Sequence, residues 1–439
     1  MNLRYWNIAA LLLCVGSVCS AEDWPQWRGP ERNGVWSETN VITTLPEKPE
    51  VMWRADIGSG YSGPTVANGK VYLMDRITEP EASERVLCID ANSGKQIWKH
   101  EYECQYSISY TAGPRASVTI HDGHAYAFGA MGNLFCFEAD TGKIVWEKDL
   151  NAEYKIVSGD RTTNRMPIWG MTCSPIIYKD KVILQVGAVE SGVIAFNRKT
   201  GEEVWTATDD RGQYSSPVLT KQGDQDVLVC WTGDSVNGLD PNDGTVLWYV
   251  PWKPSRTPLG CGSPVLKDNH VFCSSFYDGS MLIELGTESP TAKKVWHLVG
   301  VNERQTKALH SMISTPLWID DHIYGVDSYG EFRCLVAETG ERVWVDETAV
   351  PKSRWSNIHF VQNGDTVWMF NERGELISAK LSPEKFEELS RAKIIEPTKR
   401  QLNRRGGVCW SHPAFAMRSV FVRNDNELIR VNLADSEAK

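Results

Sequence analysis

Two runs of Arg, Trp and His in the last quarter of the chain carry the side chains best suited to binding chemistry. The first is S-R-W-S-N-I-H, with Arg354, Trp355 and His359, and the second is N-R-R-G-G-V-C-W-S-H-P, with Arg404, Arg405, Trp410 and His412. Guanidinium groups form charge-assisted hydrogen bonds to anions, and indole rings stack on planar groups and cations. The runs therefore indicate a site for an anionic, planar or sugar-like ligand.

The same side chains also have a purely structural interpretation, which the sequence leaves open. Arg and His residues can satisfy carbonyl groups at strand ends, and Trp residues can fill the space between sheets. Alternation along a strand also turns half of any such set away from a site. Other members of the candidate set stand before other predicted strands: Tyr61, Tyr110, Trp169, Tyr214 and His310.

The chain lacks the sequence signatures of common catalytic and metal sites. It contains no G-x-S-x-G, H-E-x-x-H or P-loop motif, no C-x-x-C and no adjacent cysteines. His124, His270 and His322 fall in predicted hairpin turns where other copies have Lys. Most cysteines lie in apolar runs typical of a core, and their spacing selects no disulfide pairing. We therefore predict no catalytic residue and no metal ligand.

Residues 1–21 have the composition of a secretory signal peptide. Arg4 precedes an apolar run at 8–19 that is too short to cross a bilayer, and small residues end the segment. An N-terminal membrane anchor is the alternative. No later segment is long and apolar enough to span a membrane, so we expect a soluble, exported mature chain, periplasmic or extracellular. The net charge of −10 argues against nucleic acid or an anionic membrane as partner.

A heptad that ends in Trp recurs along the chain and defines the elements that must position these side chains. D-T-G-K-I-V-W ends at Trp146, and related copies end at Trp98, Trp205, Trp248, Trp296 and Trp344. A second anchor recurs at Pro64, Pro114, Pro175, Pro217, Pro264 and Pro316, with variants at His359 and Pro413. The eight copies recur about every 50 residues, a period typical of a propeller.

Each copy predicts four short strands. In the second copy they fall at 115–120, 124–128, 134–138 and 144–148, joined by tight turns such as H-D-G-H and A-D-T-G-K. Blade seven lacks the heptad, and its L-S-P-E-K-F-E-E-L predicts a short helix at 383–389 before a strand at 392–395. The heptad Trp residues and Trp53 are expected to dock neighbouring blades, because exposed indoles would leave large apolar areas in water.

The last copy ends near residue 433 after only three predicted strands. Its fourth strand is available as E-V-M-W-R-A at 50–55, so an N-terminal strand would close the ring. The sequence therefore predicts an all-β fold, an eight-bladed β-propeller of four-stranded antiparallel blades. The predicted divisions are the signal peptide (1–21), an irregular arm (22–50), the propeller (51–434) and a tail (435–439). Inner strands line a propeller channel, which places the candidate binding residues at the channel entrance.

The A-x-x-G-x-x-x-W repeats resemble those of the PQQ-like, or quinoprotein alcohol dehydrogenase-like, β-propellers. The likeness covers about residues 51–433, and D-W-P-Q-W-R-G-P at 23–30 and W-S-H-P-A-F at 410–415 are similar to exported bacterial proteins of the BamB-like type. The dehydrogenases of this superfamily use an adjacent Cys pair and a Glu/Asn/Asp calcium set, and the pair is missing here. The resemblance implies a binding or scaffold module for a protein, peptide or glycan, without a cofactor. The alternative is a dehydrogenase of sugars or alcohols that uses PQQ with calcium.

Overall fold

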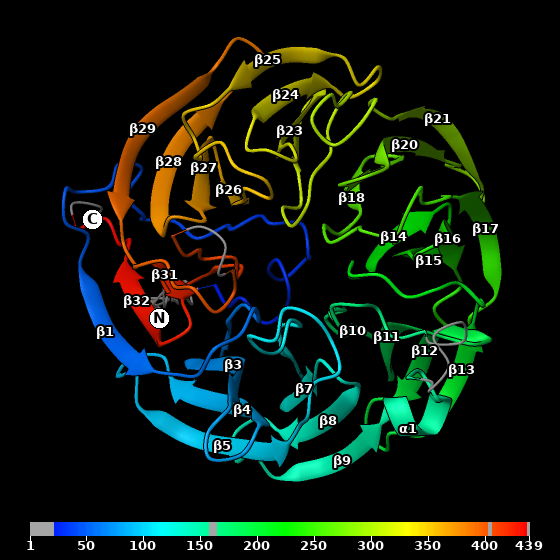
Figure 1. Ribbon diagram of the computed structural model, residues 1–439, viewed down its shortest axis with the longest axis vertical. Coiled ribbons are helices and arrows are strands. Elements are labelled where there is room, and N and C mark those ends of the chain that lie inside the picture. Colours follow the sequence, from blue (N-terminus) through cyan, green and yellow to red (C-terminus); the bar gives the residue numbers. More distant parts are fainter. Residues whose placement is uncertain (1–21, 158–164, 403–405, 437–439) are drawn as a thin grey trace, which may run out of the picture.

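The computed structural model describes residues 22–157, 165–402 and 406–436, in which eight sheets form a closed ring. The predicted signal peptide lies outside these residues. Each sheet has four antiparallel strands, and Figure 1 shows the sheets arranged as blades around a central channel. The predicted eight-bladed β-propeller is confirmed. Within the described residues, no helix combines the length and apolar composition needed to cross a bilayer.

The strands of blades 1 to 4 follow in chain order from the channel outward. Blade 1 has β2 (Thr65–Ala67), β3 (Lys70–Ile77), β4 (Ser83–Asp90) and β5 (Gln96–Glu103). Blade 2 has β6 (Thr119–His121), β7 (His124–Phe128), β8 (Asn133–Glu138) and β9 (Ile144–Asp149), followed by a short helix, α1 (Leu150–Tyr154). Blade 3 has β10 (Ile176–Tyr178), β11 (Lys181–Ala188), β12 (Ser191–Asn197) and β13 (Glu203–Ala207). Blade 4 has β14 (Val218–Gln222), β15 (Gln225–Trp231), β16 (Ser235–Leu239) and β17 (Val246–Pro251).

The same order continues around the ring. Blade 5 has β18 (Val265–Lys267), β19 (His270–Ser275), β20 (Gly279–Leu285) and β21 (Ala292–Leu298). Blade 6 has β22 (Leu317–Ile319), β23 (His322–Val326), β24 (Phe332–Val336) and β25 (Arg342–Asp346). Blade 7 has β26 (Ile358–Asn363), β27 (Thr366–Asn371), β28 (Glu375–Leu381) and β29 (Phe386–Lys393). Blade 8 has β30 (Ala414–Ala416), β31 (Ser419–Arg423), β32 (Glu427–Asn432) and, as its outer strand, β1 (Val51–Asp56).

The N-terminal strand closes the ring, as predicted. β1 pairs antiparallel with β32, with Arg54 opposite Ile429 and Asp56 opposite Glu427. Trp53 of β1 faces blade 1, where its indole N–H donates to the Ala91 carbonyl at 2.8 Å. The first strand of the propeller therefore completes the last blade by pairing with the outer side of β32.

The heptad joins blades through its Trp and its Gly together. The Trp98 indole N–H on blade 1 donates to the Ala139 carbonyl on blade 2 at 2.9 Å. A Cβ placed on Gly142 would lie 2.6 Å from the Trp98 ring, so Gly is needed for this close approach as well as for its φ of 71°. Trp146, Trp205, Trp296 and Trp344 make equivalent bonds to carbonyls of the following blades, whereas Trp248 donates to the Gln222 side chain of its own blade.

Residues 22–50 run across the far end of the channel and then along blades 7 and 8, visible as the dark blue trace at the centre of Figure 1. Trp24 pairs with Val66 of blade 1, and the Arg32 guanidinium donates to the Pro175 carbonyl of blade 3 at 2.9 Å. Trp36 is fully buried against Phe415 of blade 8, with ring centroids 5.2 Å apart. The arm thus fills the sector where blade 7 has no docking Trp.

Two details differ from the sequence prediction. The helix expected at 383–389 is wrong, because β29 occupies Phe386–Lys393 and pairs with β28. Pairing as the fourth strand of the blade outweighs the helix preference of the Glu residues in this segment. The start of the segment forms a turn, in which the Lys385 N–H donates to the Ser382 hydroxyl. The start of the inner strand of blade 2 also differs. We expected this strand to begin directly after Pro114, but it begins at Thr119.

Candidate functional site

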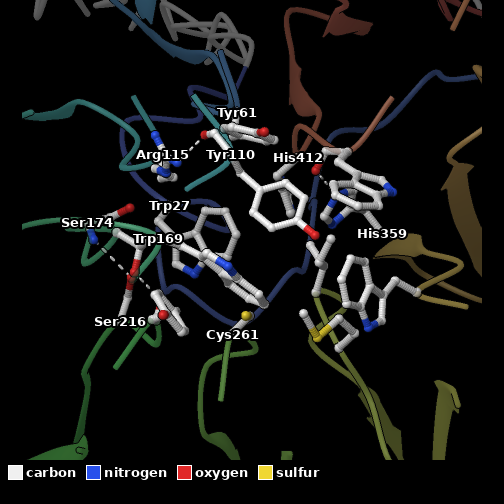
Figure 2. A pocket seen from close by; sticks show the side chains of 16 residues that line it. Trp27, Tyr61, Tyr110, Arg115, Trp169, Ser174, Ser216, Cys261, His359 and His412 are labelled. Atoms are coloured by element: carbon white, nitrogen blue, oxygen red, sulfur yellow. Dashed lines mark hydrogen bonds between the residues drawn. The ribbon is translucent and has the colours of Figure 1, made fainter. Parts of the chain in front are cut away.

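A cavity opens at the end of the channel opposite the arm. Its empty space, including the part open to solvent, is about 830 Å³. The lining is mainly aromatic and apolar (Figure 2). It consists of Trp27, Tyr61, Tyr110, Arg115, Trp169, Thr172, Ser174, Tyr214, Ser216, Cys261, Met312, Ile313, Trp355, His359, Trp410 and His412.

The deepest level of the lining comes from the segments that lead into the inner strands. Small hydroxyl residues dominate this level, and they tie adjacent blades together at the channel wall. The Ser117 N–H donates to the Ser174 hydroxyl at 3.0 Å, and the Ser174 N–H donates to the Ser216 hydroxyl at 2.9 Å. Blades 7 and 8 place His359 and His412 at the same level, with ring centroids 4.9 Å apart. The hub is therefore regular over most of the ring and divergent in one sector.

Trp27 of the arm forms the floor of the cavity. Its indole N–H donates to the Ser263 hydroxyl at 2.9 Å, and its ring lies 4.9 Å from the His412 ring. The arm is held close to this floor by the Arg32 bonds to blade 3. A ligand can therefore approach the cavity only from its open end.

Five aromatic rings surround the open end. Trp169 and Tyr214 stack with centroids 5.0 Å apart, and Tyr110 meets Trp169 edge-on at 5.4 Å. Trp355 contacts both Trp169 and Trp410 at 6.2 and 6.4 Å. Such rings contribute a large apolar contact area at low conformational cost, and they can take up an aromatic or aliphatic side chain, a planar ligand or a sugar face.

The two hub histidines are neutral at neutral pH. Burial lowers the pKa of His359 to about 4, although its hydrogen bond to the Trp410 carbonyl acts in the opposite direction. Burial, with the nearby His359 and Arg28, lowers the pKa of His412 well below its ordinary range. The lining contains one guanidinium, that of Arg115, which lies 4.9 Å from the Tyr61 ring centroid and donates to the Ser109 carbonyl. No lining residue is Asp or Glu.

The structure brings eight of the predicted site residues into the lining: Tyr61, Tyr110, Trp169, Tyr214, Trp355, His359, Trp410 and His412. Arg354 lies beside it, with its guanidinium carbon 4.5 Å from the Trp355 ring centroid and its Nη2 2.7 Å from Glu303. His310 is fully buried behind the wall, where it donates to the Phe276 carbonyl and accepts from the Gly300 N–H. Arg404 and Arg405 lie outside the described residues.

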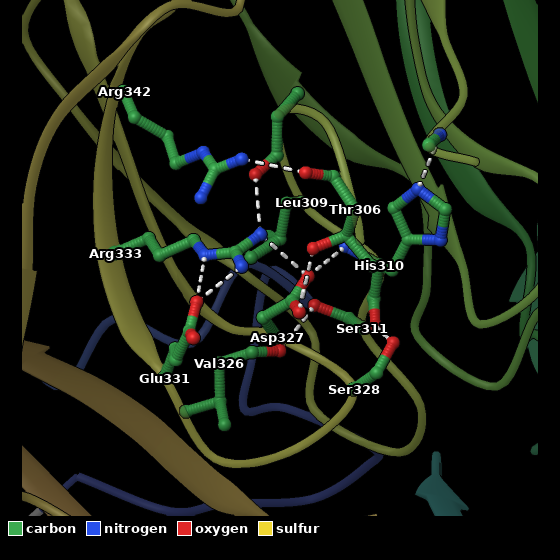
Figure 3. Close-up of polar contacts among 12 residues, drawn as sticks. Thr306, Leu309, His310, Ser311, Val326, Asp327, Ser328, Glu331, Arg333 and Arg342 are labelled. Carbon is green, nitrogen blue, oxygen red and sulfur yellow. Dashed lines mark hydrogen bonds and ion pairs between the residues drawn. The ribbon is translucent and has the colours of Figure 1, made fainter. Parts of the chain in front are cut away.

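Buried carboxylates fix the loops that carry the rim. Asp327 accepts from the His310 N–H at 2.7 Å and from the Thr306 hydroxyl at 2.9 Å, and it pairs with the buried Arg333 at 2.7 Å (Figure 3). Burial raises the pKa of Asp327 to about 6, against the lowering effect of Arg333. In other blades, loop N–H groups donate to the buried Asp75, Asp278 and Asp425 and to the half-buried Asp234. The rim is therefore fixed before any ligand arrives.

The match to known proteins covers most of the ring. The family described as outer membrane protein assembly factor BamB matches residues 82–346 and 232–438. The chain belongs to this family. BamB of Shewanella oneidensis is 22% identical over 349 residues, which span 76% of this chain and 69% of that protein. The predicted resemblance is confirmed.

Two solved structures place this BamB-family chain among known propellers. BamB from Moraxella catarrhalis gives a TM-score of 0.56 at 13% identity and covers 88% of this chain and 100% of its own. The quinohemoprotein alcohol dehydrogenase from Comamonas testosteroni gives a TM-score of 0.65 at 15% identity, and the match covers 95% of this chain and 81% of that enzyme chain. At these identities the likeness concerns the fold alone.

The lining of the BamB-family chain does not fit PQQ with calcium. Calcium takes six to eight oxygen ligands, usually with carboxylates among them, and the cavity lining has no Asp or Glu. The described residues also hold no cluster of three or more His, Cys, Asp or Glu side chains suited to a metal ion. Cys261 is the single lining cysteine, so no vicinal pair faces the cavity.

Sequence reasoning missed several residues that build this site. The sequence places Trp27 in the irregular arm and Arg115 in the strand expected at 115–120, and it marks neither as a candidate site residue. The anchoring carboxylates were also missed, although they carry a readable signal. An Asp lies near the end of the second strand or just after it in five blades, as in L-M-D at Asp75, T-G-D at Asp234, F-Y-D at Asp278, G-V-D at Asp327 and R-N-D at Asp425.

Proposed function

We propose that this protein is a binding scaffold that takes up a segment of a partner protein at the open end of its channel. One observation carries the proposal: a fixed cup of Tyr110, Trp169, Tyr214, Trp355 and Trp410 that is closed below by Trp27. A preformed aromatic cup binds a protruding side chain without the cost of ordering its own walls. The family name, an outer membrane protein assembly factor, supports a partner that is a protein.

Export is part of this proposal. Residues 1–21 have the pattern of a signal peptide, and the related BamB proteins are named for a role at the outer membrane. We infer that the scaffold works in the periplasm. Peptides and glycans also stack on aromatic rings, so they are alternative occupants that the experiment must distinguish.

Site-specific photo-crosslinking in the native organism tests the proposal. A photoreactive amino acid replaces Ile168, which is 51% exposed and adjoins Trp169. The control position is Thr141, exposed in a turn on the opposite face. We expect an adduct with a protein from position 168, and none from position 141.

A matched pair of Trp substitutions connects the adduct to the cavity. Trp169→Ser should abolish the adduct at position 168, because the substitution removes a wall of the cup. Trp318→Ser should preserve it, because Trp318 lies at the far end of blade 6, where its indole N–H donates to the Asp320 carbonyl. An adduct that persists in Trp169→Ser would contradict a protein-binding cup. An adduct that is lost only after glycosidase treatment would also contradict it, because the crosslinked species would then be a glycan.

A further inference from the structure

The rim of the cavity carries an uneven distribution of charge. The loops that lead into blades 5, 6, 7 and 8 carry a strong excess of basic residues, although the chain as a whole has a net charge of −10. Their basic residues are Lys253, Arg256, Arg304, Lys307, Lys352, Arg354, Lys399 and Arg400, and their acidic residues are Glu303, Glu347 and Glu396. In the loops that lead into blades 1, 2 and 4, Arg115 and Arg211 are balanced by Asp209 and Asp210.

Much of this positive charge is not neutralised within the protein. Lys352 pairs with Glu347, and Arg354 pairs with Glu303. Among the described residues, no carboxylate lies within ion-pair distance of Arg256, Arg304 or Lys307, and all three side chains are exposed. These three residues define what we call the basic rim. Glu303 acts electrostatically on Arg256 and Arg304, but it already pairs with Arg354, so the basic rim keeps a net positive charge toward solvent.

The basic rim is held in place next to the aromatic cup. The Arg256 guanidinium lies 5.0 Å from the Tyr277 ring centroid, and that of Arg304 lies 5.3 Å from Tyr329. The loop that carries Arg304 and Lys307 is fixed by Asp327 and is further held by Arg333, which donates to the Ala308 carbonyl at 2.9 Å (Figure 3). The same loop continues to Met312 and Ile313 of the cavity lining. Charge and cup are therefore parts of one preformed surface.

We propose that the partner presents an acidic segment, whose aromatic or long aliphatic side chain enters the cup while its carboxylates lie over the basic rim. This inference rests on the proposed function and adds the chemistry of the partner. Complementary charge steers association and excludes wrong partners, while the buried anchor supplies most of the affinity. A long polyanion such as RNA fits less well, because the net charge of the whole protein would repel it.

Fluorescence anisotropy with labelled model peptides tests the proposal. The acidic probe has one central Trp flanked on both sides by Glu, and the neutral probe has Gln in place of Glu. We expect the acidic probe to bind at least about tenfold more tightly at low salt, because several exposed charge pairs each contribute a modest free energy. The difference should shrink as salt is added.

Charge reversal on the protein assigns the effect to the basic rim. Arg256→Glu, Arg304→Glu and Lys307→Glu together should weaken the acidic probe at least about tenfold and leave the neutral probe unchanged. The matched control reverses Lys95, Lys143 and Lys199, which are exposed in turns on the opposite face. An unchanged melting temperature checks that both triple variants remain folded.

The outcomes separate this inference from the proposed function. If both probes bind equally, or if reversal of the basic rim has no effect, the acidic partner is refuted while the aromatic cup still binds peptide. If an oligouridylate displaces the acidic probe at lower concentration than the unlabelled acidic peptide does, the basic rim belongs to a polyanion and the inference is overturned. If neither probe binds and no protein crosslinks at position 168, both proposals fail.

Discussion

The blade interfaces and the hub solve the same packing problem in different ways. At the periphery, one pair of residues is repeated: an indole donates to a carbonyl of the next blade and covers the Gly of the next heptad, as Trp98 does with Gly142. At the hub, each blade contributes one position at each level, but the residue types differ from blade to blade. Small hydroxyls join blades 2, 3 and 4, whereas His359 and His412 meet in blades 7 and 8.

The difference teaches where a repeat protein keeps its specific features. A residue that joins two similar blades meets nearly the same neighbour at most interfaces, so its type recurs in most blades. A residue that faces the common channel shares that space with residues from the other blades. Its type can vary as long as the side chains together fill the channel. The hub is therefore where this propeller differs most from an idealised ring.

Removal of the closing strand should have the largest effect, because it removes both the pairing with β32 and the contact of Trp53 with blade 1. Replacing residues 50–56 with a Gly-Ser segment of equal length keeps the arm tethered and removes β1 and Trp53. We expect the unfolding midpoint to fall by roughly 10 °C or more, or the protein to aggregate. Differential scanning calorimetry measures the midpoint, and an unchanged value would mean that the arm alone closes the ring.

Gly142→Ala tests the close approach at a blade interface. The added Cβ would lie 2.6 Å from the Trp98 ring, whereas the Cβ of Gly123→Ala meets nothing within 4 Å at the same φ of 71°. The cost of a positive φ is common to both variants. We therefore expect Gly142→Ala to be less stable than Gly123→Ala by about 2 kcal/mol in urea unfolding. Equal stabilities would show that the Trp adapts without cost.

His359→Gln tests the neutral histidines of the hub through the pH dependence of stability. The pKa of His359 is about 4 in the folded protein and near its ordinary 6.5 when unfolded. The unfolded chain therefore binds more protons below pH 6.5, and the folded state loses stability as the pH falls from 6.5 to 4. The wild type should lose about 2–3 kcal/mol more than His359→Gln over this interval. The contribution of Asp327 to the pH dependence of stability has the opposite sign. Both proteins contain Asp327, so its contribution cancels from the difference between them.

Ser174→Ala should have the smallest effect, because it removes one link between two blades at the channel wall. The Ser117 N–H, buried at this level, loses the hydroxyl that it reaches at 3.0 Å. We expect a loss of about 1–2 kcal/mol in the free energy of unfolding, since a buried donor is left without a partner. The exposed Ser93→Ala should stay within about 0.5 kcal/mol of the wild type. A larger effect at Ser93 would contradict a special role of the hub hydroxyls.

The sequence predicted the ring because its signals are local and repeated. The Gly turn and the Trp of the heptad lie within seven residues of one another, and together they form the contact at most of the blade interfaces. The prediction of β1 as the last strand followed from a count of strands, which needs no knowledge of contacts. The helix in blade 7 failed for the opposite reason, because pairing with β28 overrode a local preference.

The candidate site was only partly readable. Trp169, Trp355, His359, Trp410 and His412 reach the cavity as a group, since all precede or begin inner strands. His310 precedes an inner strand as well, but its side chain turns toward Phe276 and Gly300. The direction of a side chain at a strand end depends on contacts with the neighbouring blade. Trp27 could not be placed, because its position depends on the path of an arm that has no regular secondary structure.

The closure of blade 8 also determines when this protein can finish folding. The strand β1 is among the first parts of the propeller to be synthesised, and its partner β32 is among the last. Contacts between such distant segments form late and make folding slow. Until then, Trp36 of the arm lacks the blade 8 surface that buries it, and β1 has no partner strand. We expect the nascent chain to depend on chaperones over this interval, because the ring can close only when β32 is available to pair with β1.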